Sequence, residues 1–75
     1  MELPHIENGV YRHNKTAKLY EVLGTALHTE TNEPLVIYKP LYASNIALFA
    51  RPYAMFVEEI TLDGEVKRRF EKIHD

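Results

Sequence analysis

The reactive side chains of this sequence concentrate on one expected hairpin. Two apolar stretches, 20–28 and 35–42, and the polar connection between them are typical of two strands with a longer loop. The hairpin carries His28, Glu30, Thr31, Tyr38 and Lys39. Together with His13, the first two would offer nitrogen and oxygen ligands to a metal ion. Their spacing lacks the short repeat that marks a metal site, so the sequence predicts no metal centre and no cofactor.

The usual catalytic patterns are missing from the sequence. Ser44 is the only serine, and it lies in an expected turn without the glycine-flanked elbow of a nucleophile. Glu58 and Glu59 are adjacent on an expected strand, so their carboxylates point to opposite faces and cannot share a proton. The glycines are too few for a phosphate-cradling loop. The sequence therefore favours a binding module over an enzyme.

Short strands separated by turn signals must position these side chains. The expected strands are 10–13, 19–28, 35–42, 46–51, 57–62 and 65–73, with one helical turn near 52–56. Gly24 indicates a bulge or bend within its strand, and Pro40 indicates an edge because it has no amide hydrogen. Asp63-Gly64 is a strong hairpin turn. It favours a strand over a short helix for 65–73, although Val66, Phe70 and Ile73 also match helical spacing. Five or six short strands predict an all-β barrel or sandwich.

Length and composition limit the class of protein. The chain of 75 residues has room for one hydrophobic core, so we expect a single domain at 8–73 after an N-terminal arm at 1–7. It has no cysteine, which excludes disulfides and thiolate metal sites and fits a reducing compartment. No apolar run approaches the length of a membrane span, and no signal peptide is recognisable. These features predict a soluble, cytoplasmic protein.

Several motifs in fixed order resemble a small bacterial family, domain of unknown function 1653. They are Gly9-x-Tyr11-Arg12-His13-x-Lys15, Leu19-Tyr20-Glu21-Val22-Leu23-Gly24, His28-x-Glu30-Thr31, Val36-x-Tyr38, Leu41-Tyr42, Arg51-Pro52 and Met55-Phe56-x-Glu58. The resemblance covers about residues 9 to 70 and implies a compact SH3-like β-barrel without implying an activity. Two loops, 16–18 and 43–45, depart from the family's pattern.

The polar residues within these motifs are the candidate site. They are Tyr11, Arg12, His13, Lys15, His28, Glu30, Thr31, Tyr38 and Arg51. An arginine can hold an anion through two parallel hydrogen bonds, and a tyrosine offers a stacking face. We expect His13, His28, Glu30, Tyr38 and Arg51 to converge at one barrel mouth and to bind a small anionic or nucleotide-like ligand. The alternative is structural: His28 and Glu30 pair to hold the loop, and Arg51 binds backbone carbonyls.

Two other kinds of partner remain open. Small barrels bind single-stranded nucleic acid through aromatic side chains and a basic groove, although the net charge of −2 gives no global attraction to it. A protein partner could pair with an exposed edge, either the strand limited by Pro40 or the outer strand near Lys67 to Phe70. It could also dock on an aromatic groove of Phe49, Tyr53 and Phe56, although the interpretation we favour is that these three rings close the bottom of the barrel.

Overall fold

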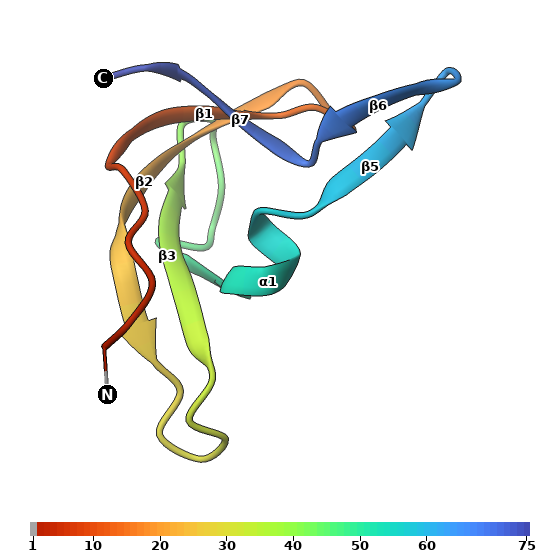
Figure 1. Ribbon diagram of the computed structural model, residues 1–75. Coiled ribbons are helices and arrows are strands. Elements are labelled where there is room, and N and C mark those ends of the chain that lie inside the picture. Colours follow the sequence, from red (N-terminus) through yellow and green to blue (C-terminus); the bar gives the residue numbers. More distant parts are fainter. Residues whose placement is uncertain (1) are drawn as a thin grey trace.

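The computed structural model describes residues 2–75 and contains seven short strands and one helical turn (Figure 1). The elements are β1 (Gly9–His13), β2 (Lys18–Leu27), β3 (Pro34–Pro40), β4 (Phe49–Pro52), α1 (Tyr53–Phe56), β5 (Glu59–Leu62), β6 (Glu65–Arg68) and β7 (Phe70–His74). The chain is therefore mostly β, as the sequence predicts. In the described residues, no helix is long and apolar enough to cross a membrane.

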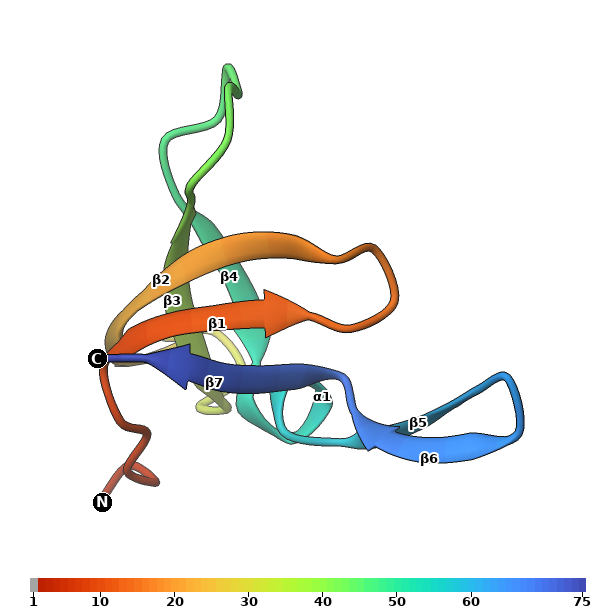
Figure 2. The same cartoon turned by 90° about the horizontal axis from the view of Figure 1, so that it is seen from above.

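Five of the strands form one antiparallel sheet in the order β4-β3-β2-β1-β7, and β5 pairs with β6 in a separate hairpin. The sheet is strongly curved, and α1 lies against its concave side, while the β5–β6 hairpin extends away from it (Figures 1 and 2). Strand pairing leaves β4 and β7 as the two edges. The pairings among residues 2–75 thus do not close the sheet into the expected barrel.

The segment 65–73, expected to be one strand, forms two strands, so the expected total of five or six strands is too low. Residues up to Arg68 pair with β5, whereas residues from Phe70 onward pair with β1. Arg69 lies at the change of partner. Its amide donates to the Glu58 carbonyl (2.9 Å), and its own carbonyl accepts from the Asn14 amide (2.9 Å). One residue therefore links the sheet to the hairpin.

The turn predicted at Asp63-Gly64 and the bulge predicted at Gly24 are both confirmed. Asp63 and Gly64 form the β5–β6 turn with φ of 52° and 81°. The pairing of β2 with β3 shifts register between Val22 and Gly24, which is the expected bulge. Because the bulge adds one residue, the alternation of side chains along β2 reverses beyond it.

The segment between β3 and β4 differs from the prediction. β3 ends at Pro40, and β4 begins at Phe49 rather than at Ile46. In the intervening loop, the Ser44 hydroxyl accepts a hydrogen bond from the Ile46 amide (3.1 Å). Among the described strands, Pro40 is paired with β2 alone and lies beyond the last pair between β3 and β4. Its missing amide hydrogen therefore does not interrupt the β3–β4 pairing.

The core lies on the concave side of the sheet and is largely aromatic. Its buried hydrophobic residues are Tyr11, Tyr20, Val22, Val36, Tyr38, Phe56 and Phe70. Phe70 stacks on Phe56 with ring centroids 4.1 Å apart and on His13 at 4.5 Å. The helical turn α1 places Phe56 in this core, where its ring packs against Tyr11, Tyr38 and Phe70.

Candidate functional site

The structure divides the nine predicted site residues among several places. His13, Tyr38 and Arg51 meet around Phe70 on the concave face, and we call these four residues the Arg51 cluster. They come from β1, β3, β4 and β7. The remaining six residues lie outside this cluster, in the turns, on β1 and beside a separate pocket.

Arg51 is the centre of the cluster. Its Nε donates to the Tyr38 hydroxyl (3.2 Å), and its guanidinium carbon lies 5.3 Å from the centre of the Phe70 ring. No carboxylate of residues 2–75 lies within ion-pair distance of Arg51. Its two terminal nitrogens form no hydrogen bond to any described residue, and they remain accessible to solvent. The expected bonds from Arg51 to backbone carbonyls are not formed. A half-buried guanidinium held in this way has donors free for an anion.

His13 is the one buried polar residue of the cluster, with 8% of its surface exposed. Its Nδ1 lies 3.0 Å from the Thr16 hydroxyl, whereas its Nε2 is buried and has no partner within the described chain. Burial lowers the pKa of His13, and the positive charges of Arg51, Arg69 and Lys15 lower the pKa further. The imidazole is therefore neutral at pH 7 and lies in a positive local field.

Aromatic side chains extend from the cluster toward solvent. Tyr20 contacts Tyr38 edge-on, and its hydroxyl is hydrogen-bonded to that of Tyr42 (3.0 Å). Burial, followed by this hydrogen bond, raises the pKa of Tyr20 to about 12. Tyr42 and Phe49 are half-buried, and Lys18 Nζ lies 4.7 Å from the centre of the Tyr42 ring. The side of the cluster near β4 thus combines flat rings with cations.

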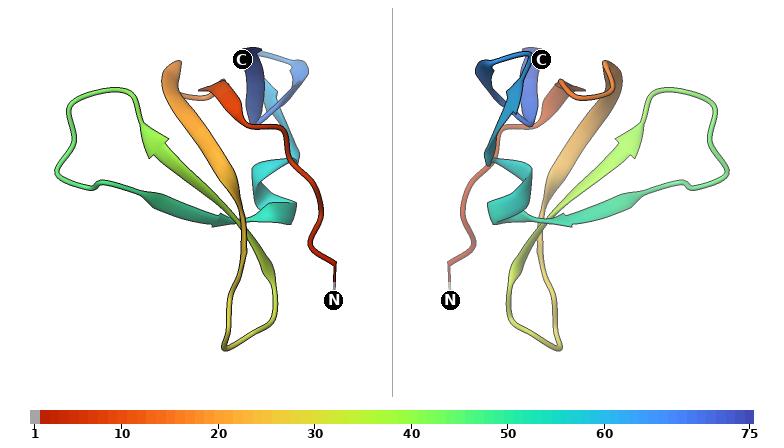
Figure 3. Two further views of the ribbon diagram at one scale, coloured as in Figure 1. Left: turned by 90° about the vertical axis from the view of Figure 1, so that its left-hand side faces the viewer. Right: turned by 90° about the vertical axis from the view of Figure 1, so that its right-hand side faces the viewer.

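The β2–β3 loop carries His28, Glu30 and Thr31 at the end of the hairpin, where it projects beyond the sheet (Figures 1 and 3). His28 Nδ1 accepts from the Glu30 amide (3.2 Å), and the Thr31 hydroxyl accepts from the Glu33 amide (3.3 Å). These bonds shape the loop through backbone amides. The Glu30 carboxylate is not the partner of His28, and none of the three contacts the Arg51 cluster.

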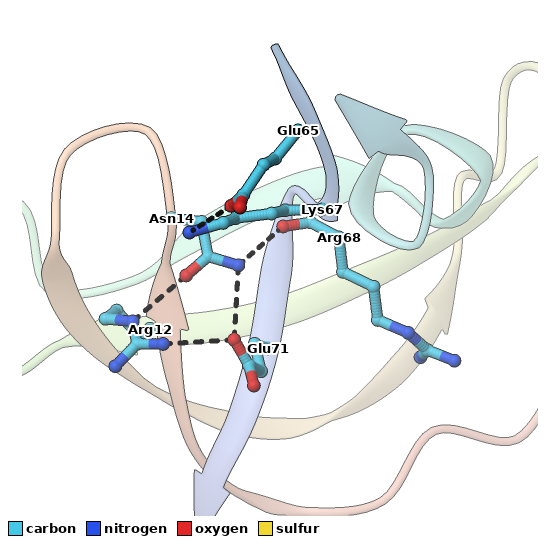
Figure 4. Close-up of polar contacts among 6 residues, drawn as sticks. All are labelled: Arg12, Asn14, Glu65, Lys67, Arg68 and Glu71. Carbon is cyan, nitrogen blue, oxygen red and sulfur yellow. Dashed lines mark hydrogen bonds and ion pairs between the residues drawn. The ribbon is translucent and has the colours of Figure 1, made fainter. Parts of the chain in front are cut away.

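Arg12 is engaged elsewhere. Its Nη2 lies 3.0 Å from Glu71 Oε1, and its Nε donates to Asn14 Oδ1 (3.0 Å; Figure 4). Asn14 Nδ2 in turn donates to the Arg68 carbonyl (2.7 Å), which fixes the β1–β2 turn to the end of β6. Lys15 is exposed in that turn. Neither Arg12 nor Lys15 belongs to the Arg51 cluster.

Tyr11 lies beside a pocket of about 370 Å³ that the sequence did not reveal. Three distant segments line it, namely residues 5–7, residues 53–57 and residues 68–72. The Tyr11 hydroxyl donates to the Glu7 carbonyl (2.7 Å), which holds the N-terminal arm against the sheet. No group of metal-ligating side chains is found among residues 2–75.

Comparisons with known proteins agree with the motifs. The family model described as "Protein of unknown function (DUF1653)" matches residues 9–72. No curated protein matches the chain. A crystal structure of a DUF1653 protein from Bordetella bronchiseptica shares 31% sequence identity with it, over 92% of this chain and 88% of that one, with a TM-score of 0.85. On the match of its motifs, sequence and fold, the chain belongs to the DUF1653 family.

Proposed function

We propose that this protein is a small binding module that recognises an anionic, nucleotide-like group at the Arg51 cluster. The observation that carries the proposal is the half-buried Arg51, which has no carboxylate partner among the described residues and is held by Tyr38 and Phe70. A half-buried cation loses part of its hydration, so a nearby negative charge stabilises it. A phosphate would supply the missing negative charge and accept two parallel hydrogen bonds.

The surroundings suit the rest of a nucleotide. Phe49 lies two residues before Arg51 on β4 and contacts the rings of Tyr38 and Tyr20. Phe49 and Tyr42 are half-buried rings at the edge of the core on the Tyr20 side, where a base would stack. Lys18 beside Tyr42 adds a second positive charge. The shared chemistry is a phosphate next to a flat ring, whether in a free nucleotide or in a single strand.

The test is an amide chemical-shift titration of the labelled full chain with adenosine monophosphate and, separately, with a mixed single-stranded DNA octamer. We expect saturable shifts at Arg51, Phe49 and Tyr38 that weaken as salt increases. Stronger binding of the octamer would assign a single strand as the ligand, and equal binding would assign the mononucleotide.

Two arginine variants provide the control. Arg51→Gln should abolish these shifts, whereas Arg12→Gln should leave them unchanged because Arg12 is paired with Glu71. Silence with both probes, or equal loss in the two variants, would overturn the proposal.

A second candidate, protein–protein interaction, is favoured by the free edge of β7. β7 has five residues, no proline and only β1 as a strand partner, whereas the opposite edge, β4, is shorter and ends at Pro52. Unpaired backbone groups of such an edge can accept another strand, and a second copy of the chain is the simplest partner. Sedimentation equilibrium should then show a dimer. A monomer over the accessible concentration range would exclude self-association.

We further infer that the curved sheet and hairpin are an opened form of the SH3-like barrel, in a cytoplasmic bacterial protein. The short bent strands and the helical turn before β5 support the fold assignment. The absence of cysteine from the sequence fits a reducing compartment. Cell fractionation of the native host would test the location.

A further inference from the structure

The pocket beside Tyr11 is separate from the proposed anion site. Residues of the N-terminal arm, of α1 and of the β6–β7 segment line it. The arm and α1 lie near one another in Figure 3. The volume of the pocket, about 370 Å³, lies in the range of small-molecule sites. Only Phe70 belongs both to this pocket and to the Arg51 cluster.

The inner part of the pocket is apolar and mostly aromatic. Tyr11, Phe56 and Phe70 form its floor and are almost fully buried, so they are fixed by the core. Tyr11 meets Phe56 edge-to-face with centroids 5.7 Å apart. Two residues complete the wall, namely Tyr53 in α1 and Val57 directly after it. Rigid rings and an apolar wall favour a ligand with a flat apolar body.

The rim has one cation free to bind a ligand. Lys72 Nζ is already neutralised, at 2.7 Å from Glu7 Oε2 and 2.7 Å from Asp75 Oδ1. Arg68 also lines the pocket and forms no ion pair with any described residue. Its backbone is fixed by Asn14, while its side chain extends away from the Arg12–Asn14–Glu71 network (Figure 4).

We propose that this pocket binds a small aromatic carboxylate, with its ring against Tyr53 and Val57 above the aromatic floor and its carboxylate on Arg68. A planar carboxylate matches the fork of a guanidinium. The carboxylate of Glu7 repels a second anion on the Lys72 side, so the acid group turns toward Arg68. A single negative charge and one or two rings define the ligand class.

The test is a chemical-shift titration of the labelled full chain with indole-3-acetate, 2-naphthoate and 4-hydroxyphenylacetate. We expect saturable shifts confined to residues 5–7, Tyr11, residues 53–57 and residues 68–72. Indole-3-acetamide, the neutral counterpart of the first probe, should bind at least about tenfold more weakly, which corresponds to about 1.4 kcal/mol. Silence across the three acids, or equal binding of the amide, would overturn the proposal.

Matched variants locate the site. Arg68→Gln should weaken the acids about tenfold, whereas Lys67→Gln, its neighbour on β6 and outside this pocket, should have no effect. Val57→Trp should block binding by filling the pocket from its exposed wall. Arg51→Gln should leave acid binding intact, which separates this proposal from the anion site. Binding that survives Val57→Trp would place the ligand elsewhere and refute the pocket assignment.

Discussion

Two valines, one in the five-stranded sheet and one in the β5–β6 hairpin, offer a direct test of where the stability lies. Val36 on β3 is 0% exposed, and Val66 on β6 is 65% exposed. Replacing either valine by alanine removes the same two methyl groups from a strand. At Val36 the lost burial is worth about 1.6 kcal/mol at ~0.8 kcal/mol per group, and the cavity left behind raises the total to roughly 2–3 kcal/mol. At Val66 we expect a change within about 0.5 kcal/mol.

Urea unfolding followed by far-ultraviolet circular dichroism measures this difference. A domain of this size is expected to have roughly 4–11 kcal/mol of stability, so Val36→Ala should still fold. With a slope near 1 kcal/mol per molar urea, its midpoint should fall by about 2–3 M, while that of Val66→Ala moves by less than about 0.5 M. Equal midpoints for the two variants would refute the assignment of the core to the concave face of the sheet.

Three further predictions concern titration and backbone strain. The pKa of His13 is below the ordinary 6.5, so as the pH falls the imidazole is protonated in the unfolded chain before it is protonated in the folded one. The free energy of unfolding is therefore lost as the pH falls below 6.5. His13→Phe should flatten this loss in urea midpoints measured down to about pH 5. An unchanged slope would assign the loss to other groups. Gly9 has φ of 139°, and a Cβ there would lie 2.6 Å from the His74 carbonyl oxygen, whereas Gly24 has a similar φ of 152° and open space. Gly9→Ala should therefore lower the melting temperature more than Gly24→Ala does. Each additional kcal/mol of lost unfolding free energy corresponds to about 4–8 °C. Equal losses in the two variants would contradict the close approach at Gly9. In an alkaline absorbance titration, Tyr20→Phe should remove the step near pH 12; if the step persists, another tyrosine carries it.

Local signals in the sequence were sufficient for the turns but not for the faces of the strands. Asp63-Gly64 and Gly24 act through their own backbone conformations, so their turn and bulge could be predicted. The effect of the bulge on β2 is less local. Val36 is buried opposite Thr25, so Thr25 shares the inner face, whereas simple alternation from Val22 assigns that face to Ala26. One inserted residue is enough to reverse the assignment.

The same distinction between local and long-range effects applies to the candidate site. Arg51 and Tyr38 meet because β3 and β4 are neighbours in the sheet, and the convergence of these two residues was already expected from the sequence. His28 was expected with them because both ends of a strand look alike in sequence. The arm at the start of the chain meets α1 and β6 in its second half through tertiary packing, so no spacing rule could reveal Arg68 as a rim residue.

The change of strand partner at Arg69 explains why the two proposed sites are neighbours. Arg69 is held by Glu58, whose Oε1 accepts from its Nε at 2.9 Å and lies 2.6 Å from its Nη2. This fixes the next residue, Phe70, with His13 and Phe56 stacked on its ring and Arg51 beside it. A substitution of Phe70 would therefore damage the core and both sites at once, and it could not assign a function to either. Substitutions of Arg51 and Arg68 leave the ring stack in place, which makes these two arginines the residues that can separate binding from folding.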